Sequence, residues 1–329
     1  MIEQPPIKLT RIGADKRWLE VLSEGLGHKC WTVKTAGNDG GQAELPLALV
    51  QSALFGRFLV SLPYINTASA NTTEPQLVMR LVDKAIAAAD HYRAKFLELR
   101  SEFTIDHPQL VTRSDAKVHM RLPLPTSPDT LWKSLDPKVR NQVRKGERSG
   151  LSVHWGSKEL LHEFYQVFSI NMRDLGTPVF SKRLFQAILL HFEQDAELCV
   201  VRLNKKPVAA GLLVHGPGFT EVPSASSLRR YNSTNANMLM YWHLLERAIA
   251  RRSTYFDFGR SSPDSGTYRF KKQWGALPCP AVWQYYLREG SINDMRPDNA
   301  RFSLAIRVWR KLPVWLTRLL GPVIVRGIP

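Results

Sequence analysis

Two stretches of the chain share one pattern of apolar and polar positions. Residues 81–87 read LVDKAIA and residues 244–250 read LLERAIA, with an apolar pair, an acid, a base and Ala-Ile-Ala in the same order. The apolar positions of both stretches recur at the spacing of an amphipathic helix. A short run of β-forming residues follows each stretch, at 96–100 and at 255–260. The pattern predicts a helix followed by a strand in each half of the chain.

Strand candidates also precede both helices. They are short apolar runs separated by turn residues, at 43–49, 57–62, 198–203 and 208–214. The polar segment NKKP at 204–207 predicts a hairpin connection between the last two runs. Glu98 and Asp257 then occupy equivalent places in the strand that follows each helix. The repeated order predicts an α/β fold with two mixed sheets flanked by helices, and chance similarity between two common helix sequences is the alternative.

A strongly basic helix is predicted between the two halves. Asp136 suits the N-cap, Pro137 the first helical position and Gly150 the position beyond the end. Arginines recur four residues apart along one face of this helix, at Arg140, Arg144 and Arg148. Guanidinium groups bind phosphate through paired hydrogen bonds, so this stripe suits a phosphate backbone. A solvated helix face is the alternative interpretation.

Composition narrows the class of protein. The 329 residues are enough for two domains, and 44% hydrophobic with 22% charged residues is typical of packed globular chains. The formal net charge of +16 raises the local concentration of anionic partners such as nucleic acid, nucleotide-linked precursors or acidic lipid. The three cysteines are widely separated and have no metal-ligand spacing, so we expect neither disulfides nor a metal site. The sequence shows no leader-like or membrane-spanning apolar run, which predicts a cytoplasmic protein.

A series of short motifs between residues 27 and 275 resembles one protein family. In chain order they are GH at 27–28, LPL at 45–47, SALFG at 52–56, SLPY at 61–64, the helix at 138–150, GTP at 176–178, DFG at 257–259, FK at 270–271 and WG at 274–275. Together they resemble the FemAB-like transferases of the GNAT superfamily, specifically the FemAB-related proteins associated with PEP-CTERM/exosortase exopolysaccharide loci. The resemblance implies GNAT-like domains at 1–125 and 151–290, a basic connecting helix at 126–150 and an amphipathic helical tail at 291–329.

The resemblance also implies a reaction. FemAB enzymes transfer an amino acid from aminoacyl-tRNA to a side-chain amine of a peptidoglycan precursor, whereas related GNAT branches use acyl-CoA or acyl carrier protein. We therefore expect an acyltransferase that forms an amide on an amine of a cell-envelope or exopolysaccharide-related acceptor, with a polyanionic donor and neither bound cofactor nor metal. An N-acyltransferase that uses acyl-CoA or acyl carrier protein is one alternative. A non-catalytic polyanion-binding protein of the exopolysaccharide system is the other.

Lys271 and Asp257 are the candidate catalytic residues. Lys271 matches the lysine of the family's Phe-Lys motif, so the resemblance implies a cation near the reacting carbonyl or the donor phosphate. Asp257 lies on a short predicted strand and suits a base or a group that orients the amine. A surface lysine and an acid that pairs with Arg260 are the corresponding structural interpretations.

Candidate substrate-binding residues lie on several segments. Those just before the second repeated helix stand where the helix dipole favours an anion, although ordinary N-capping explains such residues equally well. Relatives imply an acceptor phosphate near the arginine at 173, for which a helix-end arginine is the alternative. The full set is Arg140, Arg144, Arg173, Arg230, Tyr231, Asn237, Arg260 and Phe270.

The expected donor site lacks glycine. A typical acetyl-CoA enzyme holds the pyrophosphate with a Gly-rich turn whose N–H groups open a helix, but residues 229–238 contain none. This difference favours aminoacyl-tRNA over CoA as the donor. In the first half, Ala68 and Ser69 stand where the family usually has a Gly-Gly pair, so their side chains narrow any anion site there.

The tail is predicted to form two short basic helices. Residues 299–311 place Phe302, Ala305 and Trp309 on one side and Arg307, Arg310 and Lys311 toward the other, and 315–320 form a second helix. Such a pair suits the interface of a membrane, which would make the protein peripheral at the inner membrane. Packing of the apolar side against a lobe is the alternative.

Overall fold

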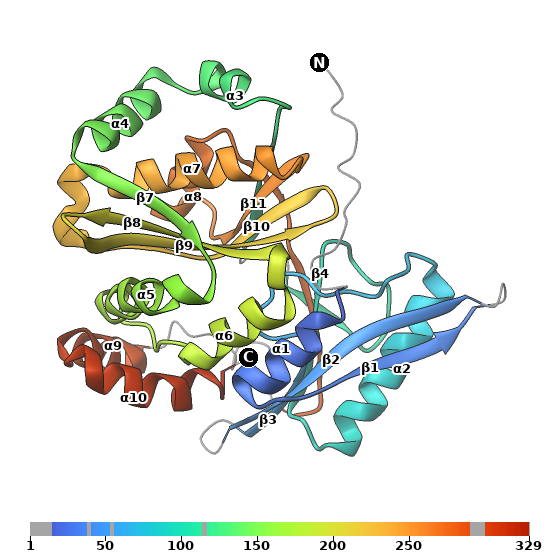
Figure 1. The fold of residues 1–329 in the computed structure, drawn as a ribbon. Coiled ribbons are helices and arrows are strands. Elements are labelled where there is room, and N and C mark those ends of the chain that lie inside the picture. Colours follow the sequence, from blue (N-terminus) through green and yellow to red (C-terminus); the bar gives the residue numbers. More distant parts are fainter. Residues whose placement is uncertain (1–14, 38–40, 53–55, 114–116, 290–299, 329) are drawn as a thin grey trace.

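The computed structural model describes residues 15–37, 41–52, 56–113, 117–289 and 300–328. Over these ranges the chain forms two mixed β-sheets with helices packed on them, followed by two C-terminal helices (Figure 1). The predicted α/β architecture of two mixed sheets is confirmed.

The first sheet has the strand order β1-β2-β3-β4-β13-β5. The strands are β1 Lys29–Ala36, β2 Gln42–Ser52, β3 Gly56–Val60, β4 Phe96–Ser101, β5 Val111–Arg113 and β13 Val282–Leu287. β3 and β4 are parallel, and the other neighbouring pairs are antiparallel. Helix α2 (Pro75–His91) connects β3 to β4, and its apolar residues, including Leu81 and Ala85, belong to the core of this lobe.

The second sheet has the strand order β12-β6-β11-β10-β9-β8-β7. The strands are β6 Val118–Pro123, β7 Leu151–Gly156, β8 Ala196–Leu203, β9 Lys206–Gly216, β10 Phe219–Ser227, β11 Tyr255–Ser261 and β12 Leu277–Pro280. Again one neighbouring pair, β10 with β11, is parallel, and helix α7 (Ala236–Ala250) connects its two strands. The remaining pairs are antiparallel.

The other helices cover the sheets and the lobe boundary. They are α1 Arg17–Leu26, α3 Pro128–Ser134, α4 Pro137–Arg148, α5 Leu161–Leu175, α6 Lys182–His191, α8 Gly266–Lys272, α9 Ala300–Lys311 and α10 Val314–Val325, with 3₁₀ turns at Lys158–Leu160, Glu193–Asp195 and Arg229–Thr234. Figure 1 shows α7 on one face of the second sheet and α5 on the other, with α9 and α10 as an outer layer on α5.

The internal repeat is a β-α-β unit. β3-α2-β4 in the first lobe corresponds to β10-α7-β11 in the second, and the predicted helix followed by a strand is confirmed in both. The predicted strands at 57–62 and 208–214 do not occupy equivalent places in the two lobes. The first is β3, which corresponds to β10, whereas the second is β9. The sequence analysis did not predict β10 as a strand, because its sequence, FTEVPSASS, is rich in polar residues.

Two local predictions are confirmed. Asn204 and Lys205 have φ values of 50° and 65° and form the two-residue turn between β8 and β9, as a hairpin requires. The Asp136 carboxylate accepts a hydrogen bond from the Lys138 N–H (2.7 Å) and caps α4. Gly150 follows the end of α4 with a φ of 70°.

Each sheet takes one strand from the opposite half of the chain. β6, inside the segment predicted as the first domain (1–125), lies between β11 and β12 of the second sheet. β13, inside the segment predicted as the second domain (151–290), lies between β4 and β5 of the first. The sheets therefore do not follow the predicted boundaries at these two places. The connecting segment 126–150 also packs into the second lobe, because the apolar residues of α3 and α4 join its core.

One hydrophobic core spans the lobe boundary. Trp18 of α1 and Ile65 of the first lobe belong to the same cluster as Phe192 of the second, and the ring centroids of Trp18 and Phe192 are 4.7 Å apart. Helices α1 and α6 also approach closely, since a Cβ atom on Gly25 would lie 2.7 Å from the Leu184 Cα atom. The lobes therefore pack as one unit around the site described next.

The tail packs through a narrow face. Thr317, Gly321 and Val325 of α10 are buried, whereas Trp315 is 67% exposed. The two predicted tail helices are thus confirmed, and the packed face is not the one that carries Trp315. The side chain of Phe302 lies outside the described residues. None of the helices in the described ranges is both long and apolar enough to cross a membrane.

Candidate active site

The second sheet opens between β10 and β11. The two strands pair only from Phe219 to Glu221 and from Tyr255 to Asp257. Directly afterwards, each strand shifts register against its outer neighbour, and Gly259 adopts a φ of 74° at the irregularity in β11. The ladder between β10 and β11 stops there. Parallel strands that separate in this way present backbone hydrogen-bonding groups to an extended ligand.

Asp257 holds the floor of this opening in place. One carboxylate oxygen accepts a hydrogen bond from Arg121 Nε (2.8 Å), and the other accepts one from the Gly259 N–H (2.7 Å). Arg121 also donates to Glu102 (2.9 Å). Asp257 is therefore buried and paired on both oxygens, and the alternative interpretation, in which it pairs with Arg260, is wrong in its partner, because the structure pairs it with Arg121.

Asn66 connects the first lobe to the opening. Its amide nitrogen donates to Glu221 (3.0 Å), and its carbonyl oxygen accepts from Arg260 Nε (3.0 Å). Burial, with a smaller contribution from the nearby charge of Asp257, raises the pKa of Glu221 to about 8, so Glu221 is mostly protonated at neutral pH. The first lobe thus contributes a polar contact to the point where β10 and β11 separate.

Two arginines from equivalent ends of the repeated strands enclose one tryptophan. The guanidinium carbon of Arg260 lies 3.6 Å from the Trp283 ring centroid, and that of Arg100 lies 4.3 Å from it. Burial lowers the pKa of Arg260 to about 9, and the like charge of Arg100 contributes to the decrease. Trp283 belongs to β13, so the strand exchange creates this contact between the lobes.

Lys271 lies beneath the irregularity in β11. Its ammonium group donates to the backbone carbonyls of Gly259 (3.1 Å) and Arg260 (2.9 Å). Burial lowers the pKa of Lys271 to about 8, and the negative charge of Asp257 partly opposes this decrease. Lys271 is 8% exposed, so it is not a surface lysine. Among the described residues, no group of three or more His, Cys, Asp or Glu side chains is placed to hold a metal ion.

A polar pocket of about 360 Å³ lies beside the opening. Its walls come from Asn171 of α5, the end of β10, the 3₁₀ turn at 229–234 and the first turn of α7. Of the predicted residues, Tyr231 and Asn237 line the pocket, together with Arg229. Arg230 is exposed beside it, with its guanidinium carbon 5.0 Å from the Tyr231 ring centroid. The structure therefore brings the predicted residues Arg230, Tyr231 and Asn237 together at this pocket.

The first turn of α7 makes this pocket suitable for an anion. Asn235 precedes the helix with a φ of 56°, a conformation that glycine adopts easily, and its side chain makes no capping hydrogen bond. The first N–H groups of a helix have no partner within the helix, and the helix dipole adds partial positive charge there. Ala236, Asn237 and Met238 of this turn line the pocket. The glycine-free stretch thus still places a helix N-terminus at the pocket.

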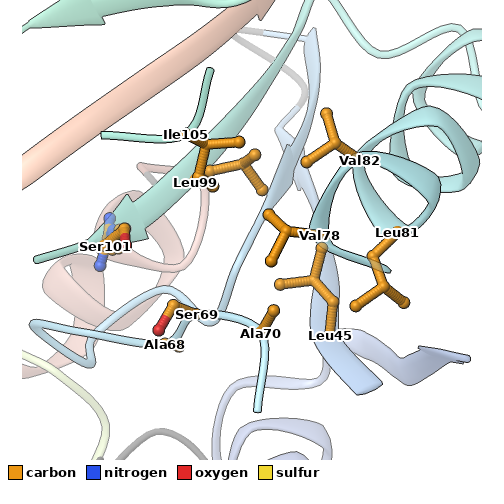
Figure 2. Close-up of a pocket in the computed structure, with 11 residues that line it drawn as sticks. Leu45, Ala68, Ser69, Ala70, Val78, Leu81, Val82, Leu99, Ser101 and Ile105 are labelled. Atoms are coloured by element: carbon orange, nitrogen blue, oxygen red, sulfur yellow. The ribbon is translucent and has the colours of Figure 1, made fainter. Parts of the chain in front are cut away.

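The first lobe has a small internal void beside α2. The space between α2 and the 68–70 loop has a volume of about 10 Å³, enough for roughly one water molecule. Figure 2 shows Ala68, Ser69 and Val78 around this narrow gap. Most of its lining residues belong to the apolar core of this lobe, so the expectation about an anion site at Ala68 and Ser69 stays a prediction.

The remaining predicted residues lie away from the pocket lining. Arg140 and Arg144 are on α4, and Arg144 stacks over Trp132 with its guanidinium carbon 5.4 Å from the ring centroid. α4 crosses the start of α7, because a Cβ atom on Gly146 would lie 3.3 Å from the Asn235 carbonyl. α4 thus meets α7 through Gly146, whereas the arginine stripe lies on the opposite side of α4 and does not line the pocket.

Two further predicted residues have packing partners. Arg173 donates to Asp174 (2.6 Å) and to the Leu312 carbonyl (3.1 Å), which ties α5 to the tail. Phe270 packs edge-on against Tyr241 with ring centroids 4.9 Å apart. Neither is brought into the pocket.

Three residues of the site were missed at the level of sequence. Glu221 is a single acid inside a strand that was not predicted, Arg121 lies on the exchanged strand β6, and Asn66 is one polar residue in a loop. The one signal in the sequence was an acid within the run FTEV, which is unusual inside a buried strand.

Comparisons with known proteins agree with this geometry. Residues 134–272 match the family model described as an acetyltransferase (GNAT) domain. FemX has a similar structure, with a TM-score of 0.63 and 15% identity over 83% of this chain and 91% of that chain. The structure of L-PGS from Bacillus licheniformis has a TM-score of 0.52 and 14% identity over 92% of this chain and 91% of that chain. The C-terminal domain of a putative lysylphosphatidylglycerol synthetase from Agrobacterium fabrum has a TM-score of 0.53 and 13% identity over 89% of this chain and 91% of that chain.

No curated protein matches the sequence. The association with PEP-CTERM/exosortase loci has no support among these comparisons and stays a prediction. The chain has the tandem GNAT-like fold of FemX, with two mixed sheets and a C-terminal helical pair.

Proposed function

We propose that this protein is an aminoacyltransferase that forms an amide on an amine of a cell-envelope acceptor, with aminoacyl-tRNA as donor. The observation that carries the proposal is the pocket at the start of α7, next to the separated strands β10 and β11. A helix N-terminus and Arg229 suit the phosphate of a donor, and the separated strands suit its acyl end. The FemAB resemblance and the GNAT match over residues 134–272 support the same reaction class.

The proposed reaction is direct aminolysis. The amine of the acceptor attacks the ester carbonyl, a tetrahedral oxyanion forms, and the ribose hydroxyl leaves with the proton that the amine loses. Lys271 contributes positive charge and fixes the carbonyls of Gly259 and Arg260, so the backbone of β11 is held for the transition state. Asp257 acts as a positioning residue, because Arg121 and the Gly259 N–H already occupy its oxygens.

Phosphates of a tRNA donor would extend from the pocket onto the basic surface around it. Arg230 borders the pocket, and the exposed Arg144 and Arg148 continue along α4. A long polyanion can contact both groups, whereas CoA carries its phosphates within one short ligand. The arrangement therefore favours tRNA over acyl-CoA or acyl carrier protein.

The test measures binding of tRNA and of CoA over a salt series. Arg229→Gln and the double variant Arg140→Gln/Arg144→Gln should each weaken tRNA binding and flatten its salt dependence by about 0.7–0.9 of a unit for every phosphate that is no longer bound. Arg80→Gln, an exposed charge on α2 in the first lobe, is the matched control and should change little. Displacement of tRNA and of heparin at the same salt concentration, together with measurable affinity for CoA, would assign the protein to the CoA-using branch instead.

A further inference from the structure

The two tail helices expose a broad apolar face. Leu304 and Val308 of α9 are 61% and 52% exposed, and Trp315, Leu319 and Val323 of α10 are 67%, 64% and 71% exposed. Within each helix these residues are four positions apart, so they share one side. Large apolar side chains gathered on one side of a structure mark an interaction surface.

The opposite side of the pair is fixed to the body of the protein. Thr317 and Gly321 are buried, and a Cβ atom on Gly321 would lie 2.7 Å from the Val179 backbone nitrogen. Arg318 donates to the Ser169 hydroxyl (2.8 Å), and Arg310 donates to the Leu175 carbonyl (3.1 Å). The helices are therefore already packed on α5, and the exposed face is the side that this packing leaves outward.

The charged residues of the two tail helices have one sign. Residues 300–328 contain five arginines, one lysine and no aspartate or glutamate. Arg307, Lys311 and Arg326 are exposed. Cations beside an apolar helical face, with tryptophan among the apolar residues, complement the headgroups and the outer hydrocarbon of an anionic bilayer.

We propose that α9 and α10 dock this protein onto the surface of an anionic phospholipid bilayer. The exposed apolar side chains of the two helices would enter the boundary between headgroups and acyl chains, while Arg307, Lys311 and Arg326 contact lipid phosphates. Each helix has 12 residues and is about 18 Å long, too short for a hydrocarbon core of about 30 Å, so the helices lie along the surface. A second copy of the chain is a poorer occupant, because two such faces would bring like charges together.

Docking would also place the donor pocket near the bilayer. Helix α5 carries the tail through Arg173 and lines the pocket through Asn171, and a helix is about 10 Å across. An acceptor amine on a lipid-linked molecule would then be within reach. This consequence rests on the proposed function, whereas docking itself does not.

The experiment compares vesicles of phosphatidylcholine alone with vesicles of equal parts phosphatidylcholine and phosphatidylglycerol, using co-sedimentation of the full chain. The wild type should bind the anionic vesicles, and the affinity should fall as salt is added. Leu319→Ser/Val323→Ser should weaken binding by about tenfold for each side chain. Arg307→Gln/Lys311→Gln should weaken it by about fivefold for each charge.

Met79→Ser is the matched control, because Met79 is an exposed apolar residue (39%) on a helix of the first lobe. It should bind vesicles like the wild type. The tail variants change exposed side chains, so their thermal unfolding should match that of the wild type.

Absence of wild-type binding to the anionic vesicles overturns the proposal, as does equal binding of all variants. Self-association of the wild type that Leu319→Ser abolishes, without vesicle binding, assigns the face to a second copy. The vesicles contain no donor, so failure here and failure of the transferase proposal are separate results.

Discussion

Replacing Lys271 by Met should abolish transfer while leaving the fold intact. Methionine keeps most of the bulk and removes the donor to the carbonyls of Gly259 and Arg260. Loss of a charged donor to buried acceptors costs about 1–3 kcal/mol of stability. Removal of the buried charge offsets this loss, since the pKa of Lys271 falls from 10.5 to about 8, which corresponds to roughly 3.5 kcal/mol at about 1.4 kcal/mol per unit of pKa. The two effects nearly cancel at pH 7.

The transition state has no such compensation. Deletion of one group that stabilises an oxyanion typically costs about 3–4 kcal/mol, a decrease of roughly 10²–10³ in rate. The assay is single-turnover transfer from labelled aminoacyl-tRNA, with urea unfolding measured in parallel at pH 7 and at pH 10. Lys272→Met, the exposed neighbour on the same helix, is the control and should transfer normally.

The pH series tests the electrostatic part of this reasoning. Because the pKa of Lys271 is lowered in the folded state, the unfolded state binds more protons between about pH 8 and 10.5, so Lys271 contributes a rise in stability over that range. Lys271→Met should lack this contribution. Full activity of Lys271→Met would remove the side chain from the site, and an identical pH dependence of the two proteins would refute the buried-charge argument.

Three further substitutions test the structure around the site. Asn66→Ala leaves Glu221 and Arg260 without their interlobe partner and should lower the free energy of unfolding by about 2–4 kcal/mol in urea titrations; a change below about 0.5 kcal/mol would mean that the contact does not join the lobes. Glu221→Gln removes a group whose pKa is raised from 4.5 to about 8, so the fall in stability that Glu221 causes between those pH values should disappear, and an unchanged pH profile would contradict its burial as a protonated acid. Gly25→Ala places a Cβ atom 2.7 Å from the Leu184 backbone and should lower the melting temperature by several degrees, whereas an unchanged value would show that α1 and α6 separate easily.

Local features of the fold were predictable because short stretches determine them. The helix of 81–87 and that of 244–250 follow from apolar spacing, the turn at 204–207 from its polar residues, and the ends of α4 from Asp136 and Gly150. Each depends on residues within about one turn of one another. The same holds for the strands that follow the two repeated helices.

Long-range features could not be read in the same way. The exchange of β6 and β13 between the sheets depends on strand partners far apart in sequence, which alternation does not specify. The partner of Asp257 is Arg121 on the exchanged strand, so the alternative interpretation named the nearby Arg260 because sequence proximity does not reveal partners from distant strands. Similarly, α10 packs through the side that carries Gly321, where a Cβ atom would lie 2.7 Å from the Val179 backbone nitrogen, and its alternating residues do not specify this side.

The pocket residues were found from sequence for a physical reason. The segment at 229–238 precedes a clear helix, and helix N-termini bind anions whether or not glycine is present. By contrast, Glu221 was missed because its effect depends on complete burial between two strands. Sequence thus indicated the segment that forms the pocket, but not the buried acid beside Asp257.

The central claim is the formation of an amide from an aminoacyl ester. The most direct measurement incubates the protein with tRNA charged with labelled amino acids and an envelope fraction from cells that make it, and then treats the products with mild alkali. Aminoacyl esters hydrolyse under these conditions, whereas amides survive. We expect label to leave the tRNA and become alkali-resistant with the wild type but not with Lys271→Met. Label that remains alkali-labile, or that becomes resistant only when labelled acyl-CoA replaces aminoacyl-tRNA, would contradict the claim.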